Sequence, residues 1–448
     1  MIPESWRKSE VAVVGMGRTG AAVVRWLKEQ GARVYCSDIS DTAELRSLAS
    51  SLSGSGITVE LGRHDLRRIC EAALVIVSPG IPPSIPALQA ARAAGVEIIS
   101  ELDLAARVLR STKLIVVTGT NGKSTTTALI GHLLQAAGLS APVAGNIGRP
   151  LIELASCSPP PEWVAVEASS FQLHDSPNLA PAMGVLTNLA PDHLDRYGSV
   201  EEYYADKKLL FRNAREDSIW VLNRDNEDVL SLARGVPGSP VYFSLEGRAD
   251  AWYDRAARTL VLGSEPLMPR AELPLMGDHN VANALAAALA AQAAGLKGEE
   301  IAAGLVSFKG LPHRLEKVGE VDGVLFINDS KATNVGSTVV AVRAIDRPFV
   351  LILGGRPKGE SFAPLAKELD ERCRAVVAYG EAAPRIAAEI GERVRVEITH
   401  LLSDAVELAR NLALPGDAVL LSPACASYDQ FANYEERGTA FRRQVEEM

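Results

Sequence analysis

A glycine- and threonine-rich segment in the first third of the chain has the composition of a phosphate-binding loop. It follows the apolar run Leu114–Val117, precedes a helical pattern that continues to about Ala137, and reads Thr118-Gly119-Thr120-Asn121-Gly122-Lys123-Ser124-Thr125. Backbone amides at the start of a helix can surround a phosphate, and the helix dipole adds positive potential there. Lys123 would reach the terminal phosphates, and the Ser124 hydroxyl would bind Mg²⁺. The two glycines lie closer together than in the common form of the motif, so the loop would be shorter than usual. The strand, the Gly-Lys-Ser sequence and the helix together still predict that it binds ATP.

Charged side chains follow the next two predicted strands. Glu167 comes directly after the apolar run Trp163–Val166, and the run Val185–Thr187 leads to His193 with acidic neighbours. The carboxyl ends of parallel strands meet at one edge of a sheet, so a carboxylate there can hold Mg²⁺ beside the phosphates. His193 could ligate a second cation. Taken alone, each residue is also compatible with a solvated loop charge.

A second glycine-rich turn lies near the amino terminus. The run Val11–Val14 is followed by Gly15-Met16-Gly17-Arg18-Thr19-Gly20 and then by a predicted helix, Ala21–Gln30. In this context backbone amides can contact a nucleotide phosphate. Asp38 follows the next predicted strand, Arg33–Cys36, at a point where a carboxylate can meet a ribose. Ser78-Pro79-Gly80 forms a rigid turn after another strand. The pattern fits a nicotinamide dinucleotide, another nucleotide or a purely structural turn.

Short β-branched runs alternate with longer helical patterns along most of the chain. This alternation predicts βαβ units with strands buried on both faces of parallel sheets. The predicted strands are Val11–Val14, Leu74–Val77, Leu114–Val117, Trp163–Val166, Val185–Thr187, Val324–Ile327, Phe349–Leu353, Ala375–Ala378 and Ala418–Leu421. One doubly wound sheet rarely needs so many strands, and breaks near Arg107–Lys113 and Lys309–Pro312 divide the chain. We therefore expect an α/β protein of three domains, residues 1–110, 111–311 and 312–448.

The composition argues against several classes of protein. The 448 residues are 47% apolar and 23% charged, as in globular proteins and unlike disordered or fibrous ones. The formal charge of −9 is opposite to that of most nucleic-acid binders, so no nucleic-acid partner is expected. The five cysteines are widely spaced without a CxxC pair, and no run of about 18 apolar residues occurs. We expect a cytoplasmic protein without a membrane partner.

Together these motifs resemble the Mur ligase family, the ATP-dependent amide-bond ligases of peptidoglycan synthesis, over essentially the whole chain. The resemblance rests on the phosphate loop, Gly145-Asn146-Ile147-Gly148, Glu167-Ala168-Ser169-Ser170-Phe171-Gln172-Leu173, Asp192-His193-Leu194-Asp195 and Gly277-Asp278-His279-Asn280-Val281-Ala282-Asn283-Ala284. Two further stretches resemble the D-glutamate-adding branch of the family. They are Asn328-Asp329-Ser330-Lys331-Ala332-Thr333-Asn334 and Ser422-Pro423-Ala424-Cys425-Ala426-Ser427-Tyr428-Asp429-Gln430-Phe431.

The resemblance implies a fold and a reaction. The fold would combine a Rossmann-like N-terminal domain for a UDP-linked substrate, a central P-loop ATPase-like parallel sheet for ATP, and a Rossmann-like C-terminal domain for the amino acid. The reaction would add D-glutamate to UDP-N-acetylmuramoyl-L-alanine through an acyl phosphate, with ATP and two Mg²⁺ ions. The N-terminal glycine turn would then hold a uridine diphosphate. Because three domains would surround one ligand set, we expect a monomer that closes around its substrates.

The resemblance also implies a role for individual residues. ATP would contact Gly119, Thr120, Asn121, Gly122, Lys123, Ser124, Thr125, Asn280, Asn283, Arg314 and Asp329. The UDP-linked substrate would contact Gly15, Gly17, Thr19, Gly20, Asp38, Ser78, Pro79, Gly80, Asn146 and His193, and D-glutamate would contact Thr333, Lys358, Ser427 and Tyr434. Metal ligands would be Ser124, Glu167, His193 and Lys207, and the catalytic group would comprise Lys123, His193, Lys207 and Lys331.

Two of these residues raise chemical questions. Lys207 lies on the predicted helix Val200–Asn213, and an ammonium group cannot ligate a cation. The family resolves this by carbamylating the lysine with CO₂, although only about one lysine in a thousand is neutral at neutral pH when its pKa is near 10.4. At Tyr434 the family commonly has phenylalanine, so the hydroxyl has no assigned role.

Three alternatives remain open from the sequence alone. Another ligase of the superfamily, such as a folylpolyglutamate synthetase-like enzyme, would keep the ATP site and change the third-domain residues. A nicotinamide-dependent dehydrogenase would use the N-terminal turn and leave Lys123, Glu167 and His193 without a role. A non-catalytic nucleotide-binding regulator would lack the metal-site residues, which are present here.

Overall fold

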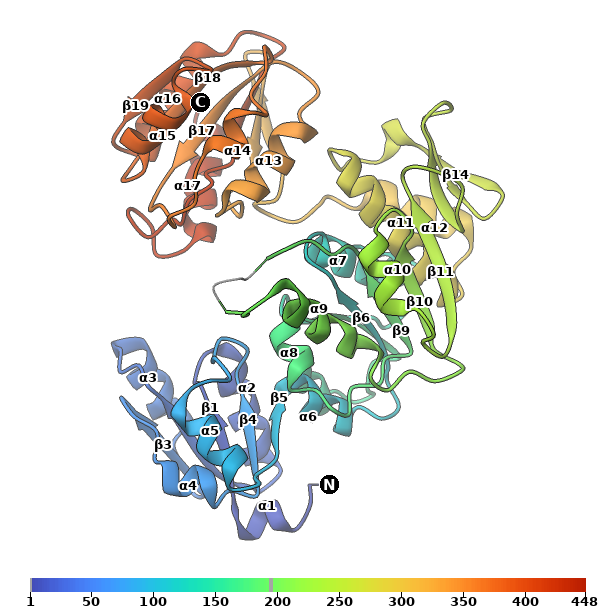
Figure 1. The fold of residues 1–448 in the computed structure, drawn as a ribbon, viewed down its shortest axis with the longest axis vertical. Helices are drawn as coiled ribbons and strands as arrows, with labels where there is room; N and C mark the ends of the chain where they lie inside the picture. Colours follow the sequence, from blue (N-terminus) through green and yellow to red (C-terminus); the bar gives the residue numbers. More distant parts are fainter. Residues whose placement is uncertain (1, 193–195) are drawn as a thin grey trace. The chain divides into compact units, whose positions relative to one another are not determined.

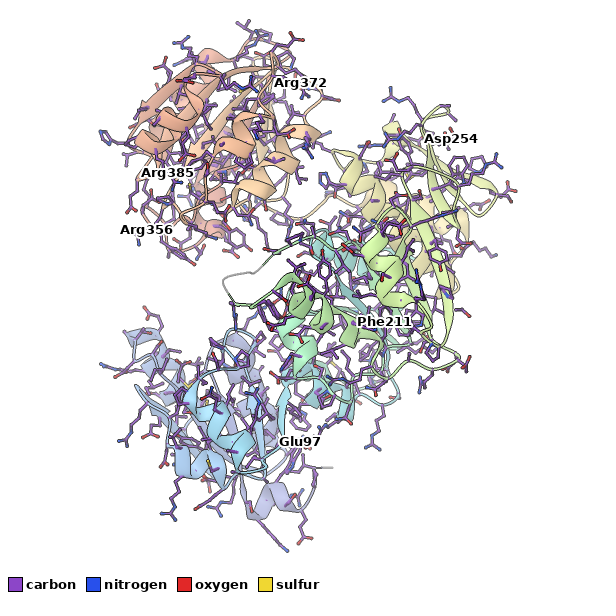
Figure 2. All side chains as sticks on the ribbon, viewed as in Figure 1. Glu97, Phe211, Asp254, Arg356, Arg372 and Arg385 are labelled. Atoms are coloured by element: carbon purple, nitrogen blue, oxygen red, sulfur yellow. The ribbon has the colours of Figure 1, made fainter. Side chains whose placement is uncertain are left out.

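The computed structural model describes residues 2–192 and 196–448, with its ribbon in Figure 1 and its side chains in Figure 2. Contacts divide the chain into two units, Met1–Leu273 with Ala282–Phe308, and Pro274–Val281 with Lys309–Met448. Among the described residues, the first unit holds a five-stranded and a nine-stranded sheet, and the second holds a six-stranded sheet. The predicted α/β fold class is therefore confirmed.

The N-terminal sheet is parallel throughout, with the strand order β3-β2-β1-β4-β5. Its elements are α1 (Ser5–Lys8), β1 (Glu10–Val14), α2 (Arg18–Glu29), β2 (Arg33–Asp38), α3 (Ala43–Leu52), β3 (Ile57–Leu61), α4 (Leu66–Cys70), β4 (Leu74–Val77), α5 (Pro86–Ala93), β5 (Ile98–Ser100) and α6 (Glu101–Val108). Val11 and Val13 face one core while Ala12 and Val14 face another, because helices cover both faces. The strand order reverses between β1 and β4, which leaves a crevice at their carboxyl ends.

The central sheet has the order β14-β13-β12-β11-β10-β9-β6-β8-β7. Its strands are β6 (Lys113–Thr118), β7 (Val143–Gly145), β8 (Trp163–Glu167), β9 (Met183–Leu186), β10 (Ile219–Asn223), β11 (Ser239–Ser244), β12 (Ala251–Asp254), β13 (Thr259–Leu262) and β14 (Glu265–Pro269). Its helices are α7 (Lys123–Ala136), η1 (Leu151–Ser156), α8 (Ser170–His174), α9 (Val200–Lys208), η2 (Leu209–Phe211), α10 (Glu227–Ala233), η3 (Arg270–Glu272), α11 (Asp278–Ala293) and α12 (Gly298–Ser307). Strands β9, β6 and β8, which precede the predicted ATP and metal residues, are neighbours in this order.

This region differs from the sequence-based expectation in two respects. The α-helix expected over Val200–Asn213 ends at Lys208, and the chain tightens into the 3₁₀ turn Leu209–Phe211. Strands β12, β13 and β14 pair antiparallel at the sheet edge. They were not predicted, because a strand such as Ala251–Asp254 alternates buried and partly exposed side chains and contains no continuous apolar run.

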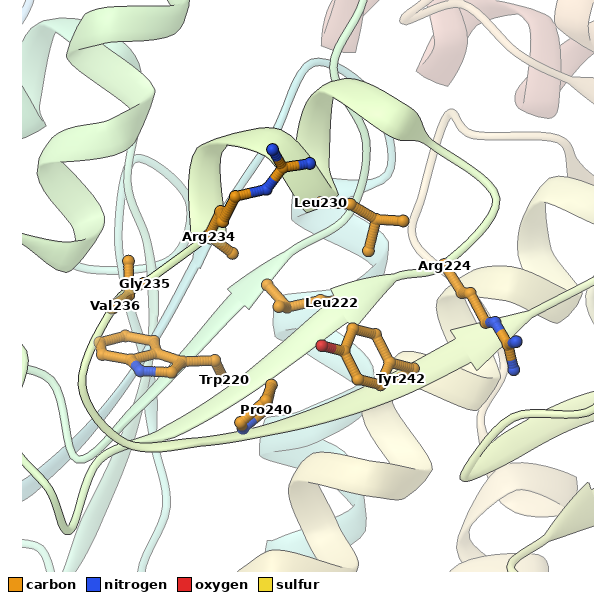
Figure 3. A pocket seen from close by; sticks show the side chains of 10 residues that line it. Trp220, Leu222, Arg224, Leu230, Arg234, Gly235, Val236, Pro240 and Tyr242 are labelled. Carbon is orange, nitrogen blue, oxygen red and sulfur yellow. The ribbon is translucent and has the colours of Figure 1, made fainter.

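A hollow of about 590 Å³ lies between α10 and the face of strands β10 and β11 (Figure 3). Trp220 and Leu222 of β10 and Tyr242 of β11 point into it, since alternate residues of a strand share a face. The Trp220 indole N–H donates to the Pro237 carbonyl at 2.7 Å. Among the described residues, none with a role assigned from the sequence lines this hollow.

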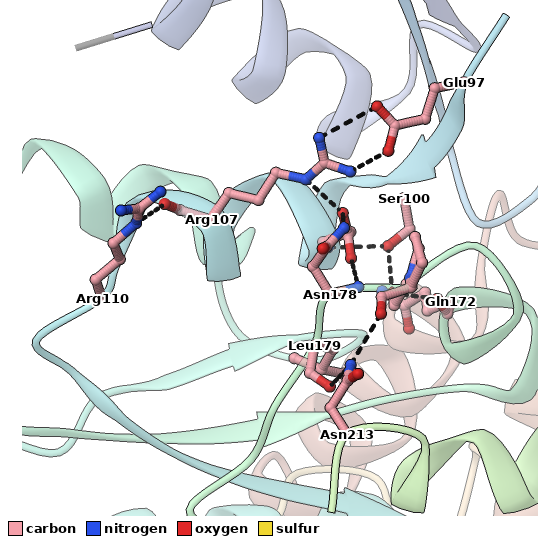
Figure 4. Close-up of polar contacts among 11 residues, drawn as sticks. Glu97, Ser100, Arg107, Arg110, Gln172, Asn178, Leu179 and Asn213 are labelled. Carbon is pink, nitrogen blue, oxygen red and sulfur yellow. Dashed lines mark hydrogen bonds and ion pairs between the residues drawn. The ribbon is translucent and has the colours of Figure 1, made fainter.

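Buried polar groups join helix α6 to the central part of the same unit (Figure 4). The Ser100 amide donates to the Asp175 carbonyl at 2.5 Å. The Asp103 carboxylate accepts from the backbone and side-chain amides of Asn178, at 2.5 and 3.1 Å, and from Arg107 Nε at 2.8 Å. These hydrogen bonds compensate for the burial of Ser100 and Asp103.

Glu101, at the same junction, is a carboxylic acid with only 2% of its surface exposed. Its Oε1 accepts from the Ile152 amide at 2.6 Å, and burial raises its pKa from 4.5 to about 7. Below about pH 7 the folded protein therefore favours the protonated side chain. Its contribution to stability is complete below about pH 4.5 and is lost as the pH rises through about 7.

We expect Glu101→Gln to flatten the pH dependence of the unfolding free energy in this range. The wild-type protein should lose about 3 kcal/mol from this group, and the amide cannot ionise. Urea unfolding at about pH 5 and about pH 8 measures the difference. Glu97→Gln is the matched control, because that side chain is 51% exposed, and it should follow the wild type. The prediction would be contradicted if the unfolding free energy changed equally between these two pH values in the wild type and in Glu101→Gln.

The C-terminal unit is built on the strand order β15-β16-β20-β17-β18-β19. Its elements are β15 (Glu316–Val321), β16 (Val324–Asn328), α13 (Val335–Ala344), β17 (Phe349–Gly354), α14 (Ala363–Ala366), β18 (Cys373–Tyr379), α15 (Ala383–Ile390), β19 (Val396–Thr399), α16 (Leu402–Leu412), β20 (Ala418–Leu421) and α17 (Tyr434–Glu446). Leu351 faces the core beside α13, α14 and α15, and Val350 faces the core beside α16 and α17. Its strands β16, β20, β17, β18 and β19 pair parallel.

The sequence also raised questions about the state of the cysteines and the presence of membrane-spanning segments. The five cysteines are free thiols. In the described part of the chain, no helix combines the length and the apolar character needed to cross a bilayer.

Candidate active site

The phosphate loop lies between β6 and α7, and its glycines adopt conformations and positions that other residues could not. Gly119 and Gly122 have φ angles of +139° and +83°. A Cβ atom on Gly119 would lie 2.1 Å from Thr187 Oγ1, and one on Gly122 would lie 2.3 Å from Asn283 Oδ1. Lys123 Nζ donates to the carbonyls of Gly119 and Thr120, at 3.0 and 2.7 Å. The loop is thus a backbone-lined cradle of the kind that accepts phosphate oxygens.

Several predicted ATP residues therefore lie together. Ser124 and Thr125, at the first turn of α7, are 4% and 8% exposed. The Asn121 amide donates to Asn188 Oδ1 at 2.8 Å, just past strand β9. Asn283 accepts a hydrogen bond from Thr126 Oγ1 at 3.2 Å, so its side chain lies beside the loop.

Glu167 ends strand β8 and has the features of a cation ligand. It is 1% exposed, and its Oε1 accepts from Asn146 Nδ2 at 2.7 Å. Its Oε2 is buried and has no hydrogen-bond partner among the described residues. A buried oxygen of this kind is costly unless a donor or a cation satisfies it, and a carboxylate oxygen suits Mg²⁺. The donor set of Glu167 and Ser124 therefore fits Mg²⁺.

Lys207 is buried at the end of α9, 1% exposed, with Nζ donating to Thr118 Oγ1 at 3.1 Å. Burial lowers its pKa well below the usual value, and the charge of Lys123 lowers it further, while Glu167 acts in the opposite direction. The neutral amine is consequently far more populated than in an exposed lysine, and a neutral amine is the form that reacts with CO₂. His193, the other predicted ligand of the second cation, lies outside the described residues.

The N-terminal glycine turn follows β1 and contacts the ends of the two neighbouring strands. Gly15 has a φ of +93°, and a Cβ on Gly20 would lie 2.0 Å from the Gly15 carbonyl oxygen. Asp38, at the end of β2, accepts from the Met16 amide at 2.8 Å and from the Ser40 amide at 2.9 Å. Ser78 Oγ, after β4, donates to the Gly15 carbonyl at 3.0 Å. Asp38 therefore also has a structural role in fixing the turn.

The other predicted residues of this turn are close by in the chain. Gly17 is the N-cap of α2, and Thr19 lies in its first turn. Pro79 and Gly80 follow Ser78 in the loop after β4, and Pro79 lines a cavity of about 520 Å³. On the other side this cavity is lined by residues of α8 and α9.

An aromatic and polar cluster in this cavity was missed by the sequence analysis. The Arg196 guanidinium lies 3.9 Å from the Phe171 ring centroid, and Phe171 stacks on Tyr197 at 5.4 Å. Asp206 accepts from Tyr197 Oη and pairs with His174 Nδ1, both at 2.8 Å. The Asp206 hydrogen bond raises the pKa of His174. No local pattern marks these contacts, because the partners come from separate elements.

Three of the predicted amino-acid residues, Thr333, Lys358 and Ser427, lie in loops that follow the adjacent strands β16, β17 and β20, and Tyr434 begins helix α17. Lys331 Nζ donates to Tyr434 Oη at 3.1 Å. Lys358 Nζ donates to Thr333 Oγ1, also at 3.1 Å. Ser427, after β20, is 3% exposed. The C-terminal unit thus contains two ammonium–hydroxyl pairs.

The predicted nucleotide residues Asp329, Arg314 and Asn280 also belong to this unit. Asp329 accepts from Ser422 Oγ at 2.8 Å and from the Leu315 amide at 3.2 Å, and burial raises its pKa to about 7. Arg314 is partly buried and its charge acts on Asp329. Asn280 Nδ2 donates to the Met276 carbonyl at 2.8 Å within the same unit, whereas Asn283 belongs to the other unit.

Three family models match the sequence in succession along the chain. They are the Mur ligase MurD-like N-terminal domain over residues 9–100, the Mur ligase middle domain over residues 117–291, and the Mur ligase glutamate ligase domain over residues 313–425.

Individual proteins show the same relationship. The UDP-N-acetylmuramoylalanine–D-glutamate ligase of Koribacter versatilis is 41% identical over 99% of this chain and 98% of its own length. The enzyme of the same name from Gloeobacter violaceus is 42% identical over 96% and 98%. The crystal structure of UDP-N-acetylmuramate-alanine ligase MurC from Thermotoga maritima has a TM-score of 0.63 at 20% identity, covering 98% of this chain and 99% of that one, and shares the fold. The chain therefore belongs to the Mur ligase family, and within it to the group of UDP-N-acetylmuramoylalanine–D-glutamate ligases.

Proposed function

We propose that the protein adds D-glutamate to UDP-N-acetylmuramoyl-L-alanine in peptidoglycan precursor synthesis, with cleavage of ATP to ADP and phosphate. The observation that carries the proposal is the cluster at the ends of β6 and β8. There the glycine cradle lies beside the buried amine of Lys207 and beside a Glu167 oxygen that has no hydrogen-bond partner among the described residues. The names of the related enzymes supply the substrates. A cytoplasmic location and a monomeric state are part of the proposal.

The reaction begins when the alanyl carboxylate attacks the γ-phosphorus of ATP, which forms an acyl phosphate and releases ADP. The amine of D-glutamate then attacks the acyl carbon, loses a proton and displaces phosphate. The first step brings like charges together, at a cost of about 4 kcal/mol per unit pair at about 4 Å and an effective dielectric near 20. Lys123 and the amides of the phosphate loop would offset this repulsion.

Metal ions and a modified lysine complete the proposed site. Mg²⁺ bound through Ser124 and Glu167, with a second ion at His193 and Lys207, would supply positive charge to the transferred phosphoryl group. The Lys207 amine would take up CO₂ and release a proton, giving a carbamate whose oxygens can face a cation. Burial and the lowered pKa of Lys207 support this, because both favour the neutral amine.

The remaining residues would bind the substrates. Gly15, Gly17, Thr19 and Gly20 would hold the diphosphate of the UDP-linked substrate, with Asp38 and the Ser78-Pro79-Gly80 turn near its nucleoside and Asn146 and His193 near the muramoyl-alanine end. Asn280, Asn283, Arg314 and Asp329 would contact the nucleotide of ATP. Lys331 would neutralise a substrate carboxylate or the developing phosphate. Thr333, Lys358, Ser427 and Tyr434 would bind D-glutamate through charge-assisted hydrogen bonds.

We expect ATP-dependent phosphate release from the purified protein only when Mg²⁺, UDP-N-acetylmuramoyl-L-alanine and D-glutamate are all present. The controls replace D-glutamate by L-glutamate or omit the amino acid. Release that is indifferent to the enantiomer would contradict the amino-acid assignment. No release, together with a change in nicotinamide absorbance, would instead favour the dehydrogenase alternative.

A further inference from the structure

The first turn of helix α17 lies against the turn that carries Lys331. Tyr434 is the first residue of this helix, and the side chain of the N-cap residue Asn433 accepts from the Glu436 amide at 2.7 Å. The backbone carbonyl of Tyr434 accepts from Ser330 Oγ at 2.8 Å. The backbone of Tyr434 is therefore fixed next to Lys331 independently of the tyrosine hydroxyl.

The hydroxyl of Tyr434 contacts the ammonium group of Lys331. Lys331 Nζ donates to Tyr434 Oη at 3.1 Å and lies 5.0 Å from the centroid of the same ring. The His313 ring lies edge-on to the Tyr434 ring, with centroids 6.2 Å apart, and limits its orientation. A lysine side chain has four flexible bonds, and ordering it costs rotamer freedom. Because Tyr434 Oη already orders the ammonium group in the free protein, less of this cost arises when the substrate binds.

We propose that the hydroxyl of Tyr434 is a positioning group that orients the ammonium of Lys331 to receive a carboxylate of the amino-acid substrate. The proposal rests on the proposed function, in which the substrate is D-glutamate. A dicarboxylic amino acid needs more than one cationic group, and this unit holds a second pair of the same type, Lys358 with Thr333. The hydroxyl of Tyr434 thereby gains a role that its ring alone would not provide.

The test is Tyr434→Phe in the full-length protein, because this change keeps the ring and removes only the hydroxyl. We expect the KM for D-glutamate to rise about tenfold, as for the loss of one hydrogen bond to a charged group. The KM values for ATP and for UDP-N-acetylmuramoyl-L-alanine should stay at the wild-type level, and kcat should change by less than about threefold. Tyr428→Phe is the matched control, since Tyr428 is in the same unit and is 63% exposed.

Two results would overturn the proposal. One is an unchanged KM for D-glutamate in Tyr434→Phe. The other is a lowered melting temperature with equal increases in all three KM values, because that pattern would indicate a packing role. Failure of the proposed function is distinguishable, because the wild-type protein itself would then release no phosphate in response to D-glutamate. In that case the proposed role of Tyr434 in D-glutamate binding would be removed as well.

Discussion

Replacing Lys207 by alanine is expected to lower the rate of D-glutamate-dependent phosphate release by about a thousandfold, the usual effect of removing one pre-oriented electrostatic group from an active site. Lys207 is buried, and its Nζ donates to Thr118 Oγ1 at the end of β6, the strand that leads into the phosphate loop. Alanine would remove the amine on which the proposed carbamate forms. The kcat for phosphate release measures the effect.

Partial recovery of activity in Lys207→Ala tests the proposed carbamate more specifically than the loss of activity does. A short carboxylic acid added to Lys207→Ala should restore part of the rate, because it can supply the missing oxygens in the space that the side chain leaves. With ¹³C-bicarbonate, the wild-type protein should show a carbamate NMR signal that Lys207→Ala lacks. Lys208→Ala is the matched control, since the neighbouring side chain is exposed, and it should retain both the activity and the signal. Full activity of Lys207→Ala would contradict the proposed role.

The parts of the site that the sequence predicted are those carried by single strand–loop–helix units. Apolar runs predicted β6 and β8, and glycines with a following lysine and serine marked the loop. The sequence alone therefore places Ser124 and Glu167 at one sheet edge. The same reasoning brought Gly15 and Ser78 together at the edge of the N-terminal sheet. It succeeds because a parallel βαβ arrangement fixes which loops are neighbours.

The contacts that the sequence did not predict join distant segments through side-chain packing. Asp206 meets His174 across 32 residues, and Lys331 meets Tyr434 across 103. Both separations are far longer than a single helix or strand, so no periodic pattern within one element reports these contacts. The antiparallel edge strands β12 to β14 were not predicted from the sequence for another reason. Short, half-exposed strands lack the apolar runs from which the buried strands were recognised.

Arg437 combines deep burial with an unusual set of partners, and its side chain joins the two turns of the proposed amino-acid site. It lies on α17, one turn after Tyr434, and is 0% exposed. Its Nε donates to Ser330 Oγ at 2.9 Å, and Nη2 donates to the Ser330 carbonyl at 2.8 Å. Its Nη1 donates to the Cys425 carbonyl at 3.1 Å. The planar guanidinium thus holds together the turn before Lys331 and the turn that leads to Ser427.

Arg437→Met is therefore expected to destabilise the C-terminal unit by about 3 kcal/mol or more, because it leaves two buried carbonyls and a hydroxyl without their donor. Arg437→Lys should recover less than half of this loss, since a single ammonium cannot reproduce the fork of N–H groups. Arg356→Met, which removes an exposed ion pair with Glu381 (52% and 49% exposed), should cost less than about 1 kcal/mol. Urea unfolding of the three variants measures these values. If Arg437→Met cost no more than Arg356→Met, the two turns would be held by their other contacts, and the guanidinium would not be what orders Lys331 and Ser427.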